Sequence, residues 1–303
     1  MNKFYNRFFV VIAGSALLAS SFSPVFAQSP ELQEKLNETK EEVSKLLEVK
    51  DSTNLTQNEK ERKETELKIN ILLSVIELSK TQLSDLSKQL EKLSLPSSEE
   101  WEALRDSLQS SIKEADAYYS SASESIEKKR SLLFLEDVKK IGQDLEAKKK
   151  AMIDPLVIKL NNIIVAFSID PLLSLADTRL EKIELDINKI YNKNLTKNPA
   201  LKKLFVDASA LIEESHKNNS EAKEIILRLY TITNPEKDEF LNEVFDSITS
   251  STATSSTPNA TPSFSTSKID SYISALIVES IDNLQDAYDV FIKMSTNAQN
   301  YLK

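Results

Sequence analysis

Apolar residues recur in steps of three and four along residues 69–126, the spacing that gives a helix one apolar face. The run before a break at Leu95-Pro96-Ser97-Ser98 consists of Ile69, Leu72, Ile76, Ser79, Leu83, Leu86, Leu90 and Leu93. The run after it consists of Trp101, Leu104, Leu108, Ser111, Ala115, Tyr118, Ala122 and Ser125. Ser97 and Glu100 fit a capping box, which starts a new helix after the break. The two runs predict an antiparallel coiled-coil hairpin whose seam positions pair in register.

A preceding helix, expected over residues 30–50, adds a third strand to part of this hairpin. The helix expected over about 58–95 carries an additional apolar stripe that the hairpin alone would leave in water, made of Leu67, Ile71, Val75 and Leu78. A turn near residues 51–54 folds the first helix back onto that stripe. We therefore expect a three-helix bundle near the base and a two-helix arm from about residue 80 to 113, roughly 25 Å long at 1.5 Å per residue.

The tip of this arm is the candidate contact site. Leu95, Pro96 and Trp101 lie together there, and Trp101 is the only tryptophan of the chain. A two-helix seam is too narrow to cover an indole, so we expect part of the ring to be exposed. Two interpretations follow: a hydrophobic plug that closes the coiled coil, or a partner contact of the kind in which tryptophan is enriched.

The rest of the chain also reads as helix. The third helix is expected to run to about residue 153, and an Asx-Pro pair, which can cap and start a helix, recurs at Asp154-Pro155, Asp170-Pro171, Asn198-Pro199 and Asn234-Pro235. These starts predict helices over about 155–167, 171–194, 199–216, 221–231 and 235–248. Residues 249–267, of which 13 of 19 are Ser or Thr, predict a flexible linker or a glycosylatable stalk. A final amphipathic helix is expected to run to about residue 302 and to dock on the helical body or on a second copy.

Residues 1–27 have the pattern of a secretory signal peptide. Lys3 and Arg7 precede an apolar stretch from residue 8 to 22, and Val25-Phe26-Ala27 is a small-x-small-like cleavage site. We expect cleavage between Ala27 and Gln28, and hence an exported protein that is periplasmic, in the cell envelope or extracellular, with no membrane span in the mature chain. The alternative is an uncleaved membrane anchor, although 15 apolar residues are short against the roughly 20 that span a bilayer.

Composition excludes several kinds of chemistry. The chain has two Gly, one His and no Cys, which excludes Gly-rich phosphate loops, thiol nucleophiles and His-rich metal sites. Glu213-x-x-His216 has the spacing of half a di-iron site, but such sites need two of these motifs. We therefore expect no cofactor and no metal. Cleavage would leave 36 basic and 47 acidic residues, a net charge of −11, so we also expect no nucleic-acid partner.

The sequence thus predicts an all-α protein with five parts. These are a signal peptide (1–27), an elongated coiled-coil bundle with a projecting hairpin arm (28–153), a compact helical bundle (154–248), a linker (249–267) and a C-terminal helix (268–303). The order of a signal peptide and a coiled coil is similar to that in regulators of bacterial cell-wall hydrolases, in pattern and location but without a shared motif. The predicted function is a non-enzymatic scaffold, adaptor or regulator that binds a protein partner, or itself, through helical surfaces. The alternative is an exported hydrolase that uses a carboxylate pair in the 154–248 bundle.

Overall fold

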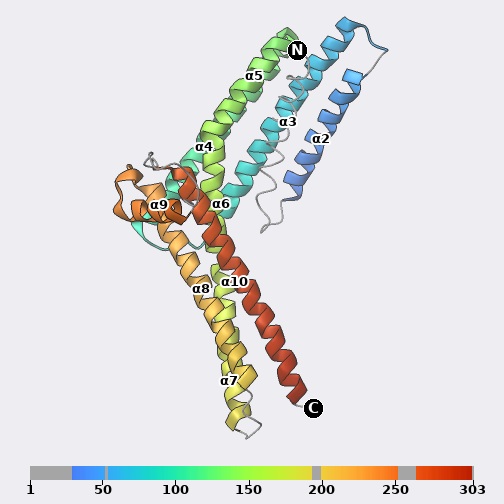
Figure 1. Cartoon of the computed structure of the whole chain (residues 1–303). Coiled ribbons are helices and arrows are strands. Elements are labelled where there is room, and N and C mark those ends of the chain that lie inside the picture. The colour runs from blue at the N-terminus through green and yellow to red at the C-terminus, as the bar shows by residue number, and fades with distance from the viewer. Residues whose placement is uncertain (1–28, 52–53, 193–198, 252–263, 302–303) are drawn as a thin grey trace. The chain divides into compact units, whose positions relative to one another are not determined.

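The computed structural model describes residues 29–51, 54–192, 199–251 and 264–301, and every regular element among them is a helix (Figure 1). The elements are α2 (Pro30–Asp51), α3 (Gln57–Lys92), α4 (Glu99–Lys129), the 3₁₀ turn η1 (Arg130–Leu132), α5 (Leu135–Lys148), the π-turn η2 (Lys149–Ile153), α6 (Asp154–Ser168), α7 (Asp170–Asn192), α8 (Pro199–Thr231), the 3₁₀ turn η3 (Pro235–Lys237), α9 (Glu239–Ser251) and α10 (Thr266–Tyr301). The all-α prediction is confirmed for these residues. The predicted signal peptide and residues 252–263 of the predicted linker lie outside them.

The chain forms two compact units, and neither is a single stretch of sequence. The first contains residues up to 92 together with 105–161, and the second contains 93–104 together with 162–303. The predicted boundary at 153/154 lies inside a continuous helical run, Leu135–Asn188. This run holds one 18-residue window apolar enough to cross a membrane, with a mean hydropathy of 1.6, and 56% of that window is buried inside the structure. A buried core helix has the same composition.

In the first unit, α2 lies antiparallel along α3, as predicted (Figure 1). The Asn70 amide donates to Glu42 at 3.4 Å, and the Lys60 ammonium donates to the Lys50 carbonyl. A fold-back about the turn expected at residues 51–54 would place Glu42 opposite a position near 65 and Lys50 opposite one near 57. The observed contacts lie about three to five residues further along α3.

The apolar stripes predicted for α3 are confirmed. On α4, some of the buried positions differ from the predicted ones. On α3 the seam residues from Ile69 to Leu90 are all buried. On α4 the buried residues are Trp101, Leu104, Leu108, Ile112, Ala115, Tyr119 and Ile126. Ile112 and Tyr119 therefore replace the expected Ser111 and Tyr118. The observed positions from Trp101 to Tyr119 follow the 3.6-residue period of a straight helix rather than the 3.5-residue period of a strict heptad, and this brings larger side chains into the core.

The helix expected from the break at 97 to residue 153 is interrupted once and distorted once. It stops at Lys129 and starts again at Leu135. At Asp154-Pro155, where we expected a new start, the chain passes through η2, in which the Asp154 N–H donates to the Lys149 carbonyl. A proline inside an α-helix clashes with the carbonyl four residues earlier, and a wider π-turn relieves this clash without ending the helix.

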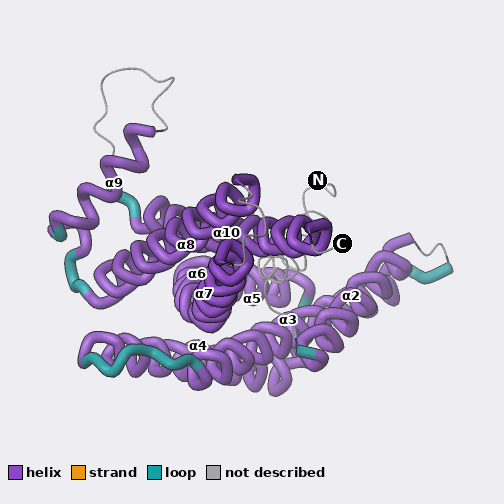
Figure 2. Tube along the Cα trace, turned by 90° about the horizontal axis from the view of Figure 1, so that it is seen from below, coloured by secondary structure: helices purple, strands orange, loops and turns teal. Residues whose placement is uncertain are grey.

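In the second unit, α8 lies antiparallel along α10 (Figures 1 and 2). Buried residues of α8 recur every seven positions: Leu201, Ala208, Ser215, Ala222 and Leu229. Those of α10 do the same at Ile273, Ser280, Ala287 and Met294. At the centre the Ser215 hydroxyl donates to the Ser280 carbonyl at 2.7 Å and the Ser280 hydroxyl donates to the Ser215 carbonyl at 2.9 Å. These reciprocal bonds require the two backbones to approach closely, which small side chains allow.

Docking of the C-terminal helix on the helical body is thereby confirmed. Of its predicted stripe, Ile277, Leu284 and Phe291 are buried, while Ala298 and Leu302 lie outside the side chains that the structure describes. The predicted break in α8 near residue 217 is wrong, because the helix continues to Thr231. Asn218 and Asn219 are buried in it, and the Asn219 amide donates to Asp170 at 3.1 Å.

Candidate interaction surface

The turn between α4 and α5, residues 130–135, presents apolar side chains to solvent. Leu132 is 73% exposed and Phe134 is 78% exposed, the two most exposed large apolar side chains among the described residues. The backbone is extended at Leu133 (φ −78°, ψ 128°) and at Phe134 (φ −94°, ψ 166°). The Phe134 N–H donates to the Asp137 carboxylate at 3.0 Å, which starts α5. The local geometry therefore directs Leu132 and Phe134 outward rather than into a helix seam.

Arg130 fixes this turn against α3. Its guanidinium donates to the Asn70 side-chain oxygen and forms ion pairs with Glu127 at 3.5 Å and Glu66 at 3.9 Å. Beside the turn lies a groove of about 740 Å³, lined by α3 residues between 58 and 69 and by residues 127–135. The exposed turn is therefore attached to α3 through Arg130, and a groove lies next to it.

We did not predict this surface, because the sequence reads as one helix through residues 128–135 and Lys128-Lys129-Arg130 reads as a solvated face. A signal was nevertheless present. Leu132-Leu133-Phe134-Leu135 is a run of four consecutive apolar residues, which cannot all lie on one helix face. Asp137 then stands three residues after Phe134, the position of a helix-start carboxylate.

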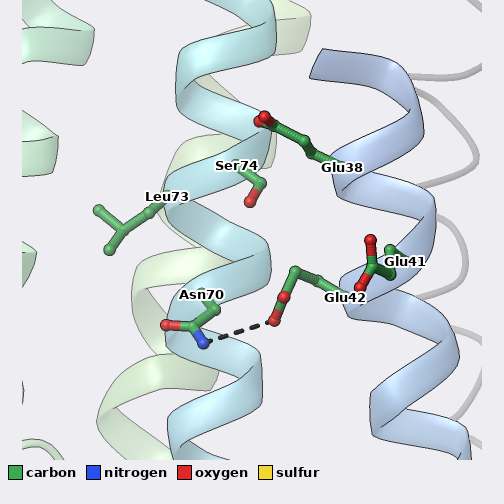
Figure 3. A pocket seen from close by; sticks show the side chains of 6 residues that line it. All are labelled: Glu38, Glu41, Glu42, Asn70, Leu73 and Ser74. Atoms are coloured by element: carbon green, nitrogen blue, oxygen red, sulfur yellow. Dashed lines mark hydrogen bonds between the residues drawn. The ribbon is translucent and has the colours of Figure 1, made fainter. Parts of the chain in front are cut away.

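A second groove, of about 290 Å³, lies between α2 and α3 and is rich in carboxylates (Figure 3). Its lining residues are Glu38, Glu41, Glu42, Asn70, Leu73 and Ser74. Each acid has a lysine partner: Lys45 pairs with Glu41 and Glu42 at 2.9 Å, and Lys35 pairs with Glu38 at 2.8 Å. Hydrogen bonds to Glu42 and Glu41 raise the pKa of Lys45. This groove is a solvated helix face whose three carboxylates are paired with two lysines.

The structure does not leave Trp101 exposed. Its side chain is only 6% exposed, and its ring meets that of Phe167 edge-on, with centroids 4.9 Å apart. The Lys223 ammonium lies 4.4 Å from the centroid of the same Phe167 ring. All three residues belong to the second unit. The expected partial exposure of the indole is therefore wrong, because a residue distant in sequence covers the ring.

The partner contact predicted for Leu95, Pro96 and Trp101 stays a prediction. Pro96 is exposed and Leu95 is half-buried. The segment that holds them belongs to the second unit and is not the free tip of an arm.

Several acids of the 154–248 segment, where the enzymatic alternative places its carboxylate pair, contact basic or amide groups. The His216 ring lies 3.0 Å from the Asp177 carboxylate, and both side chains are part-exposed. Asp170 binds Lys223 and Asn219. No group of three potential metal ligands occurs among the described residues. The hydrolase alternative stays a prediction that no described contact favours.

A polar cluster in the second unit joins α6, α8 and α10. The Tyr230 hydroxyl donates to Asp270 at 2.5 Å and accepts from the Asn162 amide at 3.2 Å. The Ser274 hydroxyl donates to the Asn162 oxygen at 3.0 Å. Burial first, and then the charge of Asp270, raise the pKa of the Tyr230 phenol. The cluster attaches the first turn of α10 to the end of α8.

We expect Tyr230 to make the protein less stable in alkali. The phenol ionises near pH 10 in an unfolded chain, while the folded chain retains the proton. Stability from this group is therefore complete below pH 10 and falls above it by about 1.4 kcal/mol per pH unit. Tyr230→Phe should cost about 1–3 kcal/mol at pH 7, because the partners lose a hydrogen bond. Urea denaturation should show this difference shrinking between pH 10 and pH 11.

The control for that measurement is Tyr272→Phe. Tyr272 donates to Glu221 at 3.0 Å, and burial raises its pKa to about 12. Tyr272 has a raised pKa as well, so this variant loses its own share of the alkaline effect, while the share that comes from Tyr230 should persist. An unchanged gap between wild type and Tyr230→Phe from pH 7 to pH 11 would contradict the assignment to Tyr230.

Comparison of the chain with models of protein families, with curated proteins and with solved structures found no match in any of the three.

Proposed function

We propose that this protein is an exported, non-enzymatic helical protein of the cell envelope or secreted fraction that binds a protein partner through the 130–135 turn. The observation that carries the proposal is the exposure of both Leu132 and Phe134 on a turn that Arg130 joins to α3. Single exposed apolar residues are ordinary on protein surfaces. Two large ones beside a groove are typical of a contact surface.

We propose that α3 and α4 form an antiparallel coiled coil, and that this pairing supports the turn. Tyr119 of α4 interacts with Ser79 of α3, and Arg130 at the end of α4 binds Asn70. The burial of the α3 seam supports the same pairing. A scaffold, adaptor or regulator needs such a support, because ordering a mobile loop on binding would cost conformational entropy.

Export can be tested directly. We expect N-terminal sequencing of the protein from its native host to begin at Gln28, because residues 1–27 have the order of charge, apolar stretch and small residues that signal peptidase cleaves. Recovery of the intact chain from membranes would contradict cleavage and would indicate an anchored protein.

Binding through the turn can be tested by placing a photo-cross-linking amino acid at position 134 in the producing cells. We expect a covalent protein adduct at Phe134 and none at Leu185, a matched apolar position that is 60% exposed in the second unit. Phe134→Ser should leave the free energy of unfolding within about 0.5 kcal/mol of wild type, because the ring is already in water. Absence of any adduct at position 134 would refute the proposed contact.

A further inference from the structure

The surface around the 130–135 turn has exposed apolar side chains and, next to them, a groove. Phe134 and Leu132 are exposed apolar side chains, here called the projection, and Phe134 also lines the edge of the groove beside α3. We propose that the partner seated on this surface is a second copy of the chain, with Phe134 and Leu132 of each copy inserted into the groove of the other. This inference rests on the proposed function and names its partner.

Symmetry favours a second copy. A patch that holds a projection and a recess side by side is self-complementary when two copies meet about a two-fold axis. Both projections are then covered at once, and the assembly closes at two molecules. A different partner would have to supply a matching projection and a matching recess of its own.

The charges around the patch favour the same arrangement. Lys128 and Lys129, exposed at the end of α4, flank the projection. The groove is lined by three carboxylates, those of Glu61, Glu66 and Glu127, and by two guanidiniums, those of Arg62 and Arg130, so it carries a small acidic excess. Glu61 and Glu66 are exposed on α3. Inserting the projection of one copy into the groove of the other brings these lysines toward these carboxylates, and complementary charge selects orientation and partner.

The charge of Glu136 and the net charge of the chain disfavour a lipid surface as the partner. Glu136, whose side chain is 82% exposed, lies two residues after Phe134, and the whole chain carries a net charge of −9. An anionic membrane would repel both. The turn and its groove form a small contact by the standard of stable interfaces, so we expect a dimer that dissociates on dilution.

The test is sedimentation equilibrium of the protein purified after export. We expect wild type to be in a concentration-dependent monomer–dimer equilibrium and Phe134→Ser to be a monomer with the same far-ultraviolet circular dichroism. Two charge variants sharpen the test. Lys128→Glu with Lys129→Glu should be a monomer, because its acidic projection meets an acidic groove. Glu61→Lys should also be a monomer, because its basic projection meets a groove that is now lined by three basic and two acidic residues.

An equimolar mixture of these two charge variants should form a heterodimer. In the mixed pair, the acidic projection of one copy meets the basic groove of the other, and the second contact remains basic projection on acidic groove. Wild type that stays monomeric, a dimer that survives Phe134→Ser, or a mixture that does not associate would each overturn the inference. If wild type is monomeric while position 134 cross-links to a different protein, the inference fails and the proposed function stands. If position 134 gives no adduct, both fail.

Discussion

Replacing Trp101 with alanine is expected to lower the free energy of unfolding by about 3–5 kcal/mol, the range for removing a large aromatic side chain from a core. The indole is 6% exposed and packs edge-on against Phe167, so truncation leaves a cavity on one side of that ring. It also removes an aromatic pair, which contributes about 0.5–1.5 kcal/mol beyond its buried area.

Thermal or urea unfolding of Trp101→Ala, compared with wild type, measures this loss. Leu132→Ala is the matched control, since it removes a large side chain that is already in water and should change stability by less than about 0.5 kcal/mol. Because Trp101 is the only tryptophan, the emission of the native protein reports on this site alone. We expect a blue-shifted maximum that moves to the red on unfolding. A red-shifted native spectrum would contradict burial of the indole.

Ala287→Leu is expected to destabilise the second unit by about 1–3 kcal/mol through overpacking. Ser215 and Ser280 bond reciprocally across α8 and α10, and one heptad further along the antiparallel pair Ala208 and Ala287 take the equivalent positions. Both are fully buried. A leucine at 287 would need space that the close approach of the two helices does not provide.

The same leucine at Ala275 is the control. Ala275 is exposed on α10, so Ala275→Leu changes helix propensity and composition in the same way without entering the interface. Chemical denaturation should show a loss of stability for Ala287→Leu only. Equal stability of the two variants would show that α8 and α10 are not closely packed at this layer.

Local patterns predicted the elements well where one face of a helix decides burial. Both stripes of α3 follow directly from its apolar spacing, and docking of α10 follows from its aromatic residues. The pattern failed where two periods compete, since Ser111 and Ile112 each continue a plausible stripe on α4 and only the packed structure selects Ile112. It failed also at Pro155, because a π-turn leaves no mark in the apolar spacing.

The close packing of α8 on α10 is not visible in the apolar pattern of the sequence. Ala208, Ser215 and Ala222 are separated by full heptads, but small and polar residues do not stand out in a search for apolar stripes. Asn218 and Asn219 looked like a turn because asparagine is common in turns. The packing of α7 against α8, through Asp170, keeps them helical.

The candidate surface was missed, and the residue that was selected instead is in the core. Trp101 was predicted to be partly exposed because it is a rare aromatic residue at a helix start. Nothing near it in sequence indicates that Phe167 covers it. Leu132 and Phe134 were overlooked because a helix drawn through residues 128–135 assigns them no special position. A long-range contact, that of Phe167 with Trp101, buries the indole, and no local pattern encodes it. The turn at 130–135, by contrast, has a local mark in the four consecutive apolar residues 132–135.

The division of the second unit between residues 93–104 and 162–303 has a consequence for how the chain folds. During synthesis the ribosome delivers the first turn of α4 well before α8 and α10. Trp101 cannot contact Phe167 until the rest of α4, α5 and α6 have been synthesised. Non-local contacts of this kind slow folding. A fragment that begins at residue 162 would lack the indole from the start, and its Phe167 would face water. The second unit is therefore complete only in a chain that retains a segment from its first third.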